Sequence, residues 1–234
     1  MNMITNHLPT AELQRLDAAH HFHPFTDKAA LAAKGARVIT RGEGVWLTDS
    51  EGNRILDGMA GLWCVNIGYG RKELAQVAAR QMEELAYYNT FFQTTHVPAI
   101  ALAAEIAKLA PGDLNHVFFA GSGSEANDTN IRLVRRYWDV KGMPWRKTII
   151  ARWNGYHGST MGGGSLGGMK PIHAHGGKID GIEHIGQPYW WAEGGDMPED
   201  EFGLLRAREL EEKILQVGPD NVAAFVGEPI QGAG

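Results

Sequence analysis

Apolar residues recur at intervals of three and four positions over several long stretches of the chain, and this spacing is typical of amphipathic helices. Shorter apolar runs, bounded by turn residues, lie between these stretches and predict strands. Strands that alternate with helices favour an α/β fold with a largely parallel sheet. The predicted helices cover about 71–87, 98–109, 124–140 and 201–217, and the predicted strands cover 116–120, 148–152, 182–185 and 222–226.

The pattern before the first of these helices is that of a β-hairpin. Residues 37–48 read as one strand, residues 49–53 carry turn chemistry, and residues 54–57 return as the second strand. The first 35 residues contain a short helical stretch. The glycine and Asx content of the hairpin places it at an edge or in a small accessory layer.

Composition narrows the class of protein. With 44% hydrophobic and 21% charged residues, the chain of 234 residues is not intrinsically disordered. A net charge of −5, without a long basic run, disfavours nucleic acid or an anionic membrane as partner. A single cysteine, Cys64, excludes a disulfide framework, and no apolar run is long enough to span a membrane. The N-terminus lacks a signal-peptide pattern, so we expect a cytoplasmic protein.

Glycine is the residue type that departs from average usage. The chain has 30 glycines, roughly twice the average share. They gather between the periodic segments, where backbone approaches a ligand or turns with positive φ. This distribution favours an enzyme with a site built from loops.

The segment 118–138 runs from an apolar strand through a Gly/Ser turn into a helix. The free N–H groups of such a helix terminus form an anion site, and Gly123 and Ser124 would line it. The alternative is an ordinary N-cap by Ser122 or Ser124, with Glu125 complementing the helix dipole. The segment is neither a Walker motif nor a GxGxxG motif. Phosphate binding and simple capping therefore both stay open at this point.

Two further strand ends carry polar residues. Tyr156 and His157 follow the strand at 148–152, and Glu228 follows the strand at 222–226. Open α/β sheets bind ligands at the carboxyl ends of their strands. A turn aromatic packed on its neighbours and an acid in a salt bridge are the alternatives. Three strand ends with polar groups together favour a site.

Other candidate chemistry is weaker. Neither the histidines at 20, 21 and 23 nor those at 173 and 175 show helical i, i+4 spacing or carboxylate partners, so no metal site is predicted. A hydrolase elbow is disfavoured because the G-x-S-x-G pattern is absent around Ser159. Trp190 and Trp191 are expected to cover apolar surface.

The motifs GSGSEAND, RWNGYHGST and VGEPIQGAG, in this order and spacing, closely resemble those of the class III (omega) aminotransferases. The segments HHFHPFTD and YYNTFFQTTH, with the hairpin between them, look like the amine:pyruvate branch, which includes putrescine–pyruvate aminotransferases. The resemblance covers the whole chain. It implies the N-terminal part of a fold type I transferase dependent on pyridoxal 5′-phosphate (PLP), with a mostly parallel sheet and flanking helices. Residues 1–60 would belong to the small domain and residues 61–234 to the large, cofactor-binding domain.

The resemblance also implies roles for individual residues. The phosphate would bind to Gly123 and Ser124, Tyr156 would stack on the pyridine ring with His157 beside it, and Glu228 would join the hydrogen bonds around the ring. Aromatic residues would line the substrate pocket, and Phe91 could come from across a dimer interface. The implied cofactor-binding residues are Ser122, Gly123, Ser124, Tyr156, His157 and Glu228, and the implied substrate residues are Phe25, Trp63 and Phe91. The implied partners are a small amine donor, pyruvate and a second copy in a homodimer or dimer of dimers.

The family's Schiff-base lysine and ring-nitrogen aspartate are expected beyond Gly234. The nine lysines present do not match the family's lysine motif. Transamination needs that amine and the protonated ring, so we expect the 234-residue chain alone to be inactive. The donor amine stays open among putrescine, aromatic amines and β-alanine.

Two alternatives accompany the transaminase hypothesis. One is a truncated, non-catalytic protein that binds a phosphate ligand weakly or assembles with a partner chain supplying the lysine. The other, a nucleotide-binding protein that uses residues 121–124, is disfavoured because the lysine and magnesium ligands of such loops are missing.

Overall fold

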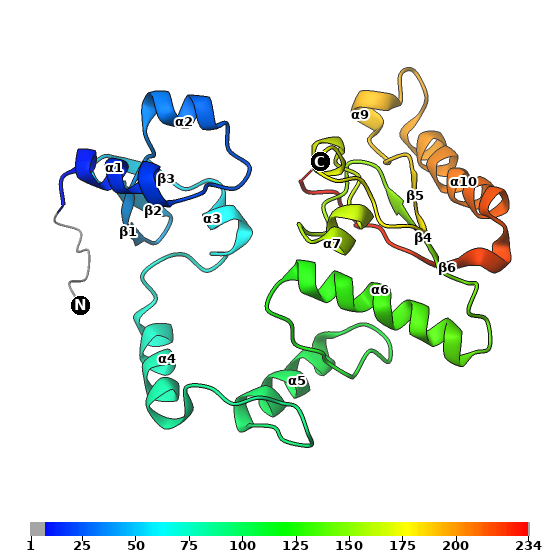
Figure 1. The fold of residues 1–234 in the computed structure, drawn as a ribbon, viewed down its shortest axis with the longest axis horizontal. Coiled ribbons are helices and arrows are strands. Elements are labelled where there is room, and N and C mark those ends of the chain that lie inside the picture. The colour runs from blue at the N-terminus through cyan, green and yellow to red at the C-terminus, as the bar shows by residue number, and fades with distance from the viewer. Residues whose placement is uncertain (1–7, 234) are drawn as a thin grey trace. The chain divides into compact units, whose positions relative to one another are not determined.

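The computed structural model describes residues 8–233 and divides the chain into two compact units, Met1–Ile100 and Ala101–Gly234. The prediction of a domain boundary at residue 60 concerns the complete family fold and stays a prediction. Figure 1 labels the elements along the chain. They are α1 (Thr10–His20), α2 (Lys28–Lys34), β1 (Ile39–Glu43), β2 (Trp46–Asp49), β3 (Arg54–Leu56), α3 (Ala60–Trp63), α4 (Lys72–Leu85), α5 (Val97–Leu109), which crosses the division, α6 (Gly123–Val140), β4 (Thr148–Arg152), α7 (Met161–Leu166), α8 (Lys170–His173), β5 (Ile182–Ile185), α9 (Trp190–Glu193), α10 (Glu199–Val217), the 3₁₀ turn η1 (Pro219–Asn221) and β6 (Val222–Phe225).

The predicted hairpin is present as a three-stranded antiparallel sheet in the order β1-β2-β3. The prediction of a single strand over residues 37–48 is wrong. The chain reverses at Gly44, whose φ of 58° suits a tight turn, and the run divides into β1 and β2. The second reversal is held by buried Asp49, whose carboxylate accepts hydrogen bonds from the backbone of Glu51 and from the backbone and side chain of Asn53. These bonds lower the pKa of the Asp49 carboxyl.

The short element α3 is a left-handed turn, since φ is positive at all of its residues, from 48° at Ala60 to 64° at Trp63. Such backbone is strained for residues other than glycine and persists only where its surroundings hold it. Asp57 does so here: its carboxylate accepts the Gly61 N–H at 2.8 Å and the Tyr69 hydroxyl at 2.7 Å. Asp57 therefore positions the turn that carries Trp63.

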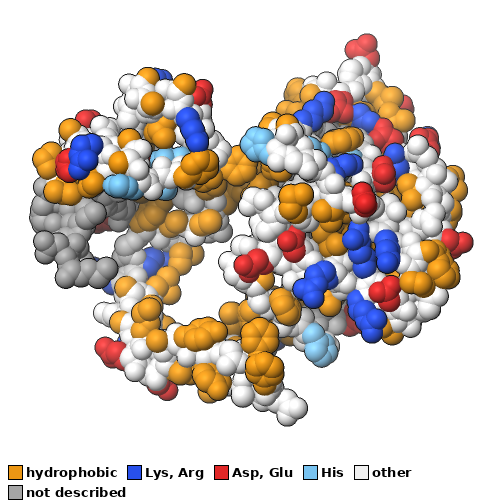
Figure 2. Space-filling model, in the orientation of Figure 1, with side chains coloured by type: hydrophobic (Ala, Val, Ile, Leu, Met, Phe, Trp, Pro, Cys, Tyr) orange, Lys and Arg blue, Asp and Glu red, His pale blue; other side chains and the backbone are white. Residues whose placement is uncertain are grey.

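Helices α4 and α5 confirm the predictions at 71–87 and 98–109 but contain no buried residue. Val77 and Met82 of α4 are more than half exposed, and Leu74 and Leu85 are exposed as well. Figure 2 shows hydrophobic side chains at the surface over much of the chain. The amphipathic pattern thus forms the helices, while their apolar faces are not covered by other described residues.

The second unit is built on a parallel sheet in the order β5-β4-β6. The central strand, β4, has Ile149, Ile150 and Ala151 almost fully buried, as expected for a parallel strand covered on both faces. On one face, Ile149 packs with Ile131 of α6 and Leu166 of α7. Each such isoleucine or leucine contributes about 1.5–3 kcal/mol by leaving water. This small core holds the strand ends that the sequence marks as functional.

Helices α6 and α10 are tied to the edge strands. The Trp138 indole of α6 donates to the Ala223 carbonyl of β6 at 2.9 Å. Next to β5, the Gly186 N–H donates to the Glu209 carboxylate of α10, also at 2.9 Å. Both helices and strands β4, β5 and β6 were predicted, and their existence is confirmed. Among residues 8–233, no helix combines the length and apolar character needed to cross a membrane.

The predicted strand at 116–120 is wrong. These residues pair with no other described strand, and Phe118 and Phe119 are exposed. An apolar run becomes a strand only when a neighbouring backbone supplies hydrogen bonds. Periodicity alone cannot report whether that neighbour is present.

Candidate functional site

The N-terminus of α6 is capped in a way that leaves two amides free. The Ser122 hydroxyl accepts the Glu125 N–H at 3.2 Å, and the Glu125 carboxylate reaches back to the Gly121 N–H at 2.8 Å. These contacts resemble a capping box, except that Glu125 accepts the N–H of Gly121, one residue before the N-cap Ser122. The amides of Gly123 and Ser124 donate to no described acceptor, and the space beside the Gly123 Cα is open. The cap and the free amides therefore coexist in one helix terminus, so the cap is compatible with the predicted anion site.

The loop after β4 lies directly against this terminus. The Ser124 hydroxyl accepts the Ser159 N–H at 3.0 Å. One turn further along α6, Asp128 Oδ1 accepts the Thr160 hydroxyl at 2.8 Å. The approach is so close that a Cβ at Gly158 would lie 2.7 Å from Ser124 Oγ, and the φ of 126° at Gly158 suits only glycine. Gly158 thus lets the loop that carries Tyr156 reach the helix.

Glu228 connects this loop with the segment after β6. Its Oε1 accepts the Tyr156 N–H and its Oε2 accepts the Gly232 N–H, each at 3.0 Å. The Arg152 guanidinium donates to the Glu228 carbonyl at 2.9 Å. Since β4 and β6 are parallel, their carboxyl ends share one edge of the sheet. The predicted salt-bridge alternative for Glu228 is not what the structure has: the carboxylate binds backbone N–H groups.

His157 lies between the same elements. Its carbonyl accepts the Asn127 amide of α6 at 2.7 Å, and a Cβ at Gly155 would stand near both His157 Nε2 and Glu228 Oε1. Burial lowers the pKa of His157 from its usual 6.5, and the nearby Glu228 carboxylate opposes part of that shift. The imidazole is therefore held neutral at physiological pH, able both to donate and to accept a hydrogen bond.

The structure thus brings together the predicted residues of the second unit. Hydrogen bonds join the loop of Tyr156 and His157 to Glu228 and to the start of α6, where Ser122, Gly123 and Ser124 lie next to one another in the chain. The identification of these residues as cofactor ligands stays a prediction.

The predicted substrate residues Phe25, Trp63 and Phe91 belong to the first unit. Each is more than half exposed. Phe25 and Trp63 have positive φ, of 47° and 64°, which is costly for aromatic residues and is common at functional sites. Phe91 stands beside Phe92, with ring centroids 6.0 Å apart. No described contact joins the three to one another.

Sequence reasoning missed three residues that hold the cluster in place, namely Asn127, Asp128 and Arg152. A usable signal existed for Asp128, because it follows Ser124 by four positions and shares its helix face. Arg152 ends a strand next to the site and could have been considered for that reason. For Asn127 no signal was available, since its partner is a backbone carbonyl 30 residues away.

Comparisons with known proteins agree with this geometry. The profile of the family described as "Aminotransferase class-III" matches residues 30–234. The chain is similar to a putrescine–pyruvate aminotransferase of Pseudomonas aeruginosa, 62% identical over all of this chain and 52% of that protein. It is also similar to a diaminobutyrate–2-oxoglutarate transaminase of Halomonas elongata, 43% identical over 99% of this chain and 50% of that protein. This chain spans about half the length of these relatives.

Solved structures lead to the same fold. An (S)-enantioselective omega-transaminase from Thermomicrobium roseum matches with a TM-score of 0.92 and 46% identity, over 95% of this chain and 50% of that one. The predicted α/β fold of type I and the predicted cofactor class are thereby confirmed. The chain belongs to the class III aminotransferases, which are PLP-dependent transferases of fold type I.

Proposed function

We propose that the complete protein is a transaminase that moves an amino group from a terminal amine, such as putrescine or an aromatic amine, to pyruvate. The products would be an aldehyde or ketone and alanine. The 62% identity over the whole chain to a putrescine–pyruvate aminotransferase carries this proposal. The family membership supports it at the level of reaction type.

The residues present fit PLP. A phosphate needs N–H donors and positive potential, and the free amides of Gly123 and Ser124 at the start of α6 offer both. We infer that these two residues bind the phosphate, with Ser122 shaping the turn. Tyr156, partly exposed beside them, would present its ring to the pyridine. When bound, PLP supplies an electron sink for negative charge next to the amine carbon.

The protein's own groups would then hold the cofactor ring in position. The Glu228 carboxylate accepts hydrogen bonds from the backbones of Tyr156 and Gly232, so it would hold these two loops together beside the ring. A ring held in a set orientation reacts faster because less freedom is lost on reaching the transition state. Neutral His157 would offer a hydrogen bond at the edge of the ring without adding charge.

Phe25, Trp63 and Phe91 would form the apolar wall of the amine pocket. Their rings are exposed in the structure, and covering them on binding an amine with a carbon chain would expel water. We infer that a second copy of the protein covers this side, in a homodimer or a dimer of dimers. Light scattering on the full-length protein would give the mass of the assembly, and a monomer would overturn this part.

The amine that attaches the cofactor is assigned to a lysine beyond Gly234. The nine lysines of the described chain do not fit the family's lysine motif. We also assign the protein to the cytoplasm, supported by the single cysteine, Cys64. Cell fractionation would test the location.

The experiment on function uses the full-length protein with PLP. Putrescine and pyruvate are supplied, and alanine and the amino-aldehyde are measured in equal amounts. We expect alanine from pyruvate at least about tenfold faster than glutamate from 2-oxoglutarate, a difference of about 1.4 kcal/mol in transition-state binding. A protein that binds PLP but forms no alanine with putrescine, aromatic amines or β-alanine would overturn the proposal.

A further inference from the structure

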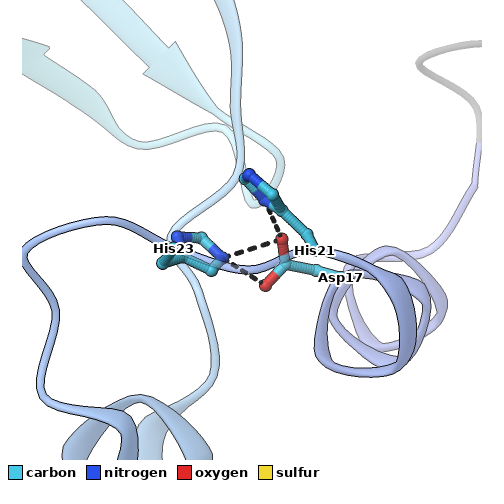
Figure 3. Close-up of side chains that lie close together, drawn as sticks. All are labelled: Asp17, His21 and His23. Atoms are coloured by element: carbon cyan, nitrogen blue, oxygen red, sulfur yellow. Dashed lines mark hydrogen bonds and ion pairs between the residues drawn. The ribbon is translucent and has the colours of Figure 1, made fainter. Parts of the chain in front are cut away.

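We propose that Asp17, His21 and His23, none of which is among the residues assigned to the cofactor or the amine, form a binding site for a divalent transition-metal ion such as Zn²⁺. The ligand atoms of the three side chains lie within 4.8 Å of one another. Figure 3 shows both imidazoles turned toward the Asp17 carboxylate. His21 Nδ1 stands 2.9 Å from Asp17 Oδ1, and His23 Nε2 stands 2.8 Å from Asp17 Oδ2.

The local fold creates this cluster from a pattern that showed no carboxylate partner in the sequence. Asp17 and His21 are separated by one helical turn, so they share a face at the end of α1. The chain leaves the helix at His21, and His23 returns to the same carboxylate from the following segment. The spacing of four positions lies between Asp17 and His21, not among the histidines at 20, 21 and 23. The prediction of no metal site rested on the spacing of the histidines alone.

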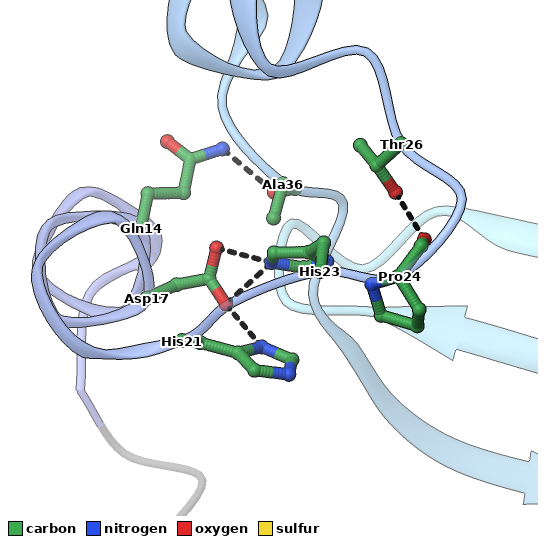
Figure 4. Close-up of polar contacts among 7 residues, drawn as sticks. All are labelled: Gln14, Asp17, His21, His23, Pro24, Thr26 and Ala36. Carbon is green, nitrogen blue, oxygen red and sulfur yellow. Dashed lines mark hydrogen bonds and ion pairs between the residues drawn. The ribbon is translucent and has the colours of Figure 1, made fainter. Parts of the chain in front are cut away.

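Neighbouring contacts hold the segment on both sides (Figure 4). The Gln14 amide of α1 donates to the Ala36 carbonyl at 2.9 Å, and the Thr26 hydroxyl donates to the Pro24 carbonyl at 2.7 Å. The two imidazole rings lie with centroids 4.2 Å apart. The three metal-ligand side chains are therefore held in place before an ion binds, which reduces the entropy cost of binding.

The donor set suits Zn²⁺ and its neighbours in the first transition row. Two imidazole nitrogens and one carboxylate oxygen are common ligands of open zinc sites, at about 2.0–2.2 Å from the ion. In a tetrahedral site, ligand atoms at such distances are ~3.3 Å apart. The N–O separations here are 2.8–2.9 Å, so each nitrogen must move a few tenths of an ångström away from the carboxylate to admit an ion in place of the shared protons.

Charge also favours a cation. Asp17 supplies a carboxylate among the three ligand side chains. A metal ion binds imidazole in its neutral form. One carboxylate then offsets half the charge of a divalent ion.

The site opens to a cavity that can supply the remaining ligand. A hollow of about 730 Å³ between α1, the following segment and α2 is lined by Asp17, His21 and His23 among others. The side chains of Asp17 and His23 are one-fifth to one-quarter exposed, and that of His21 is 60% exposed. An ion can enter from solvent and keep a water molecule in its open position.

The test is a metal titration of the full-length protein, freed of metal by a chelator, at a fixed PLP load. Co²⁺ is the spectroscopic probe, because its visible absorption rises strongly in four-coordinate sites, and Zn²⁺ is then used to displace it. We expect about one Co²⁺ ion to bind with this signature, and Zn²⁺ to displace it with higher affinity.

Matched variants attribute the binding to these residues. His21→Asn and His23→Asn keep a donor for Asp17, so the local fold is retained while a metal ligand is lost. Each is expected to weaken Co²⁺ binding at least about tenfold. His20→Asn removes a neighbouring exposed histidine outside the cluster and should bind as the unchanged protein does. Equal Co²⁺ spectra and affinities in the unchanged protein and a His21→Asn/His23→Asn double variant would overturn the proposal, as would a loss in His20→Asn of the same size.

Discussion

Glu228 offers the sharpest test of how the site is held together. The substitution Glu228→Gln preserves shape but leaves one acceptor oxygen where the carboxylate has two. In the structure, those two oxygens accept N–H groups from Tyr156 and Gly232, each at 3.0 Å. In the variant, one of these bonds is lost and the other becomes a bond between neutral groups.

The magnitude follows from these contacts. A hydrogen bond to a charged group contributes about 1.5–3 kcal/mol, and one between neutral groups contributes about 1 kcal/mol. Because Glu228 is half-buried, water can replace part of the loss, and we expect a net cost of about 2 kcal/mol. If the cofactor binds only when both loops are ordered, that cost raises the dissociation constant for PLP about 30-fold.

The assay is a PLP titration of the full-length protein, followed by absorbance, together with urea unfolding. The control is Glu211→Gln, which removes the same charge from an exposed position on α10 that has no polar contact with any described side chain. NMR titration of His157 gives a second readout. Since the Glu228 carboxylate raises the pKa of that imidazole, its removal should lower the pKa further. A dissociation constant for PLP within twofold of that of the control, together with the same free energy of unfolding, would refute the role assigned to Glu228.

Two other predictions test backbone fit and buried charge. Gly158→Ala should lower the free energy of unfolding by about 2 kcal/mol and weaken PLP binding, because φ is 126° and the new Cβ would overlap Ser124. The control is Gly142→Ala, where φ is 76° but the space is open, and it should cost about 1 kcal/mol. Equal urea midpoints for the two variants would contradict the argument. His184 is buried and stacked on Trp153, and burial lowers its pKa to about 4. The unfolded chain therefore binds the proton more tightly, so stability is complete above about pH 6.5 and falls by about 3 kcal/mol as the pH drops to 4. Urea unfolding against pH should show this slope, and His184→Gln should remove it.

The sequence predicted most elements of the second unit. Strand 148–152 and helix 201–217 combine a clear period with turn residues at both ends, and both are present as β4 and α10. The local sequence pattern gives a wrong prediction where a strand depends on its pairing with another segment. Residues 116–120 look like a strand but have no neighbour to pair with among residues 8–233, and the run at 37–48 divides because Gly44 permits a reversal.

The site was predictable in its residue types but not in its connections. Ser124, Tyr156 and Glu228 each follow a recognisable strand or turn, so a reader of the sequence can select them. That the Glu228 carboxylate binds the Tyr156 backbone could not be read from the sequence, since 72 residues separate the two. The same holds for Asp17 and His23, which are near in sequence but meet only because the chain turns back after α1.

The sequence by itself determined the long helices, the strands β4, β5 and β6, and the family of the protein, and it predicted the groups that would bind a phosphate. These properties depend on side-chain period, on turn residues and on motifs a few positions long. The tertiary structure alone decided which polar groups meet: Asp128 with the Thr160 loop, and Asp17 with two histidines. The physical reason is that a hydrogen bond or a metal site requires atoms within about 3 Å, and only the path of the folded backbone brings distant residues that close.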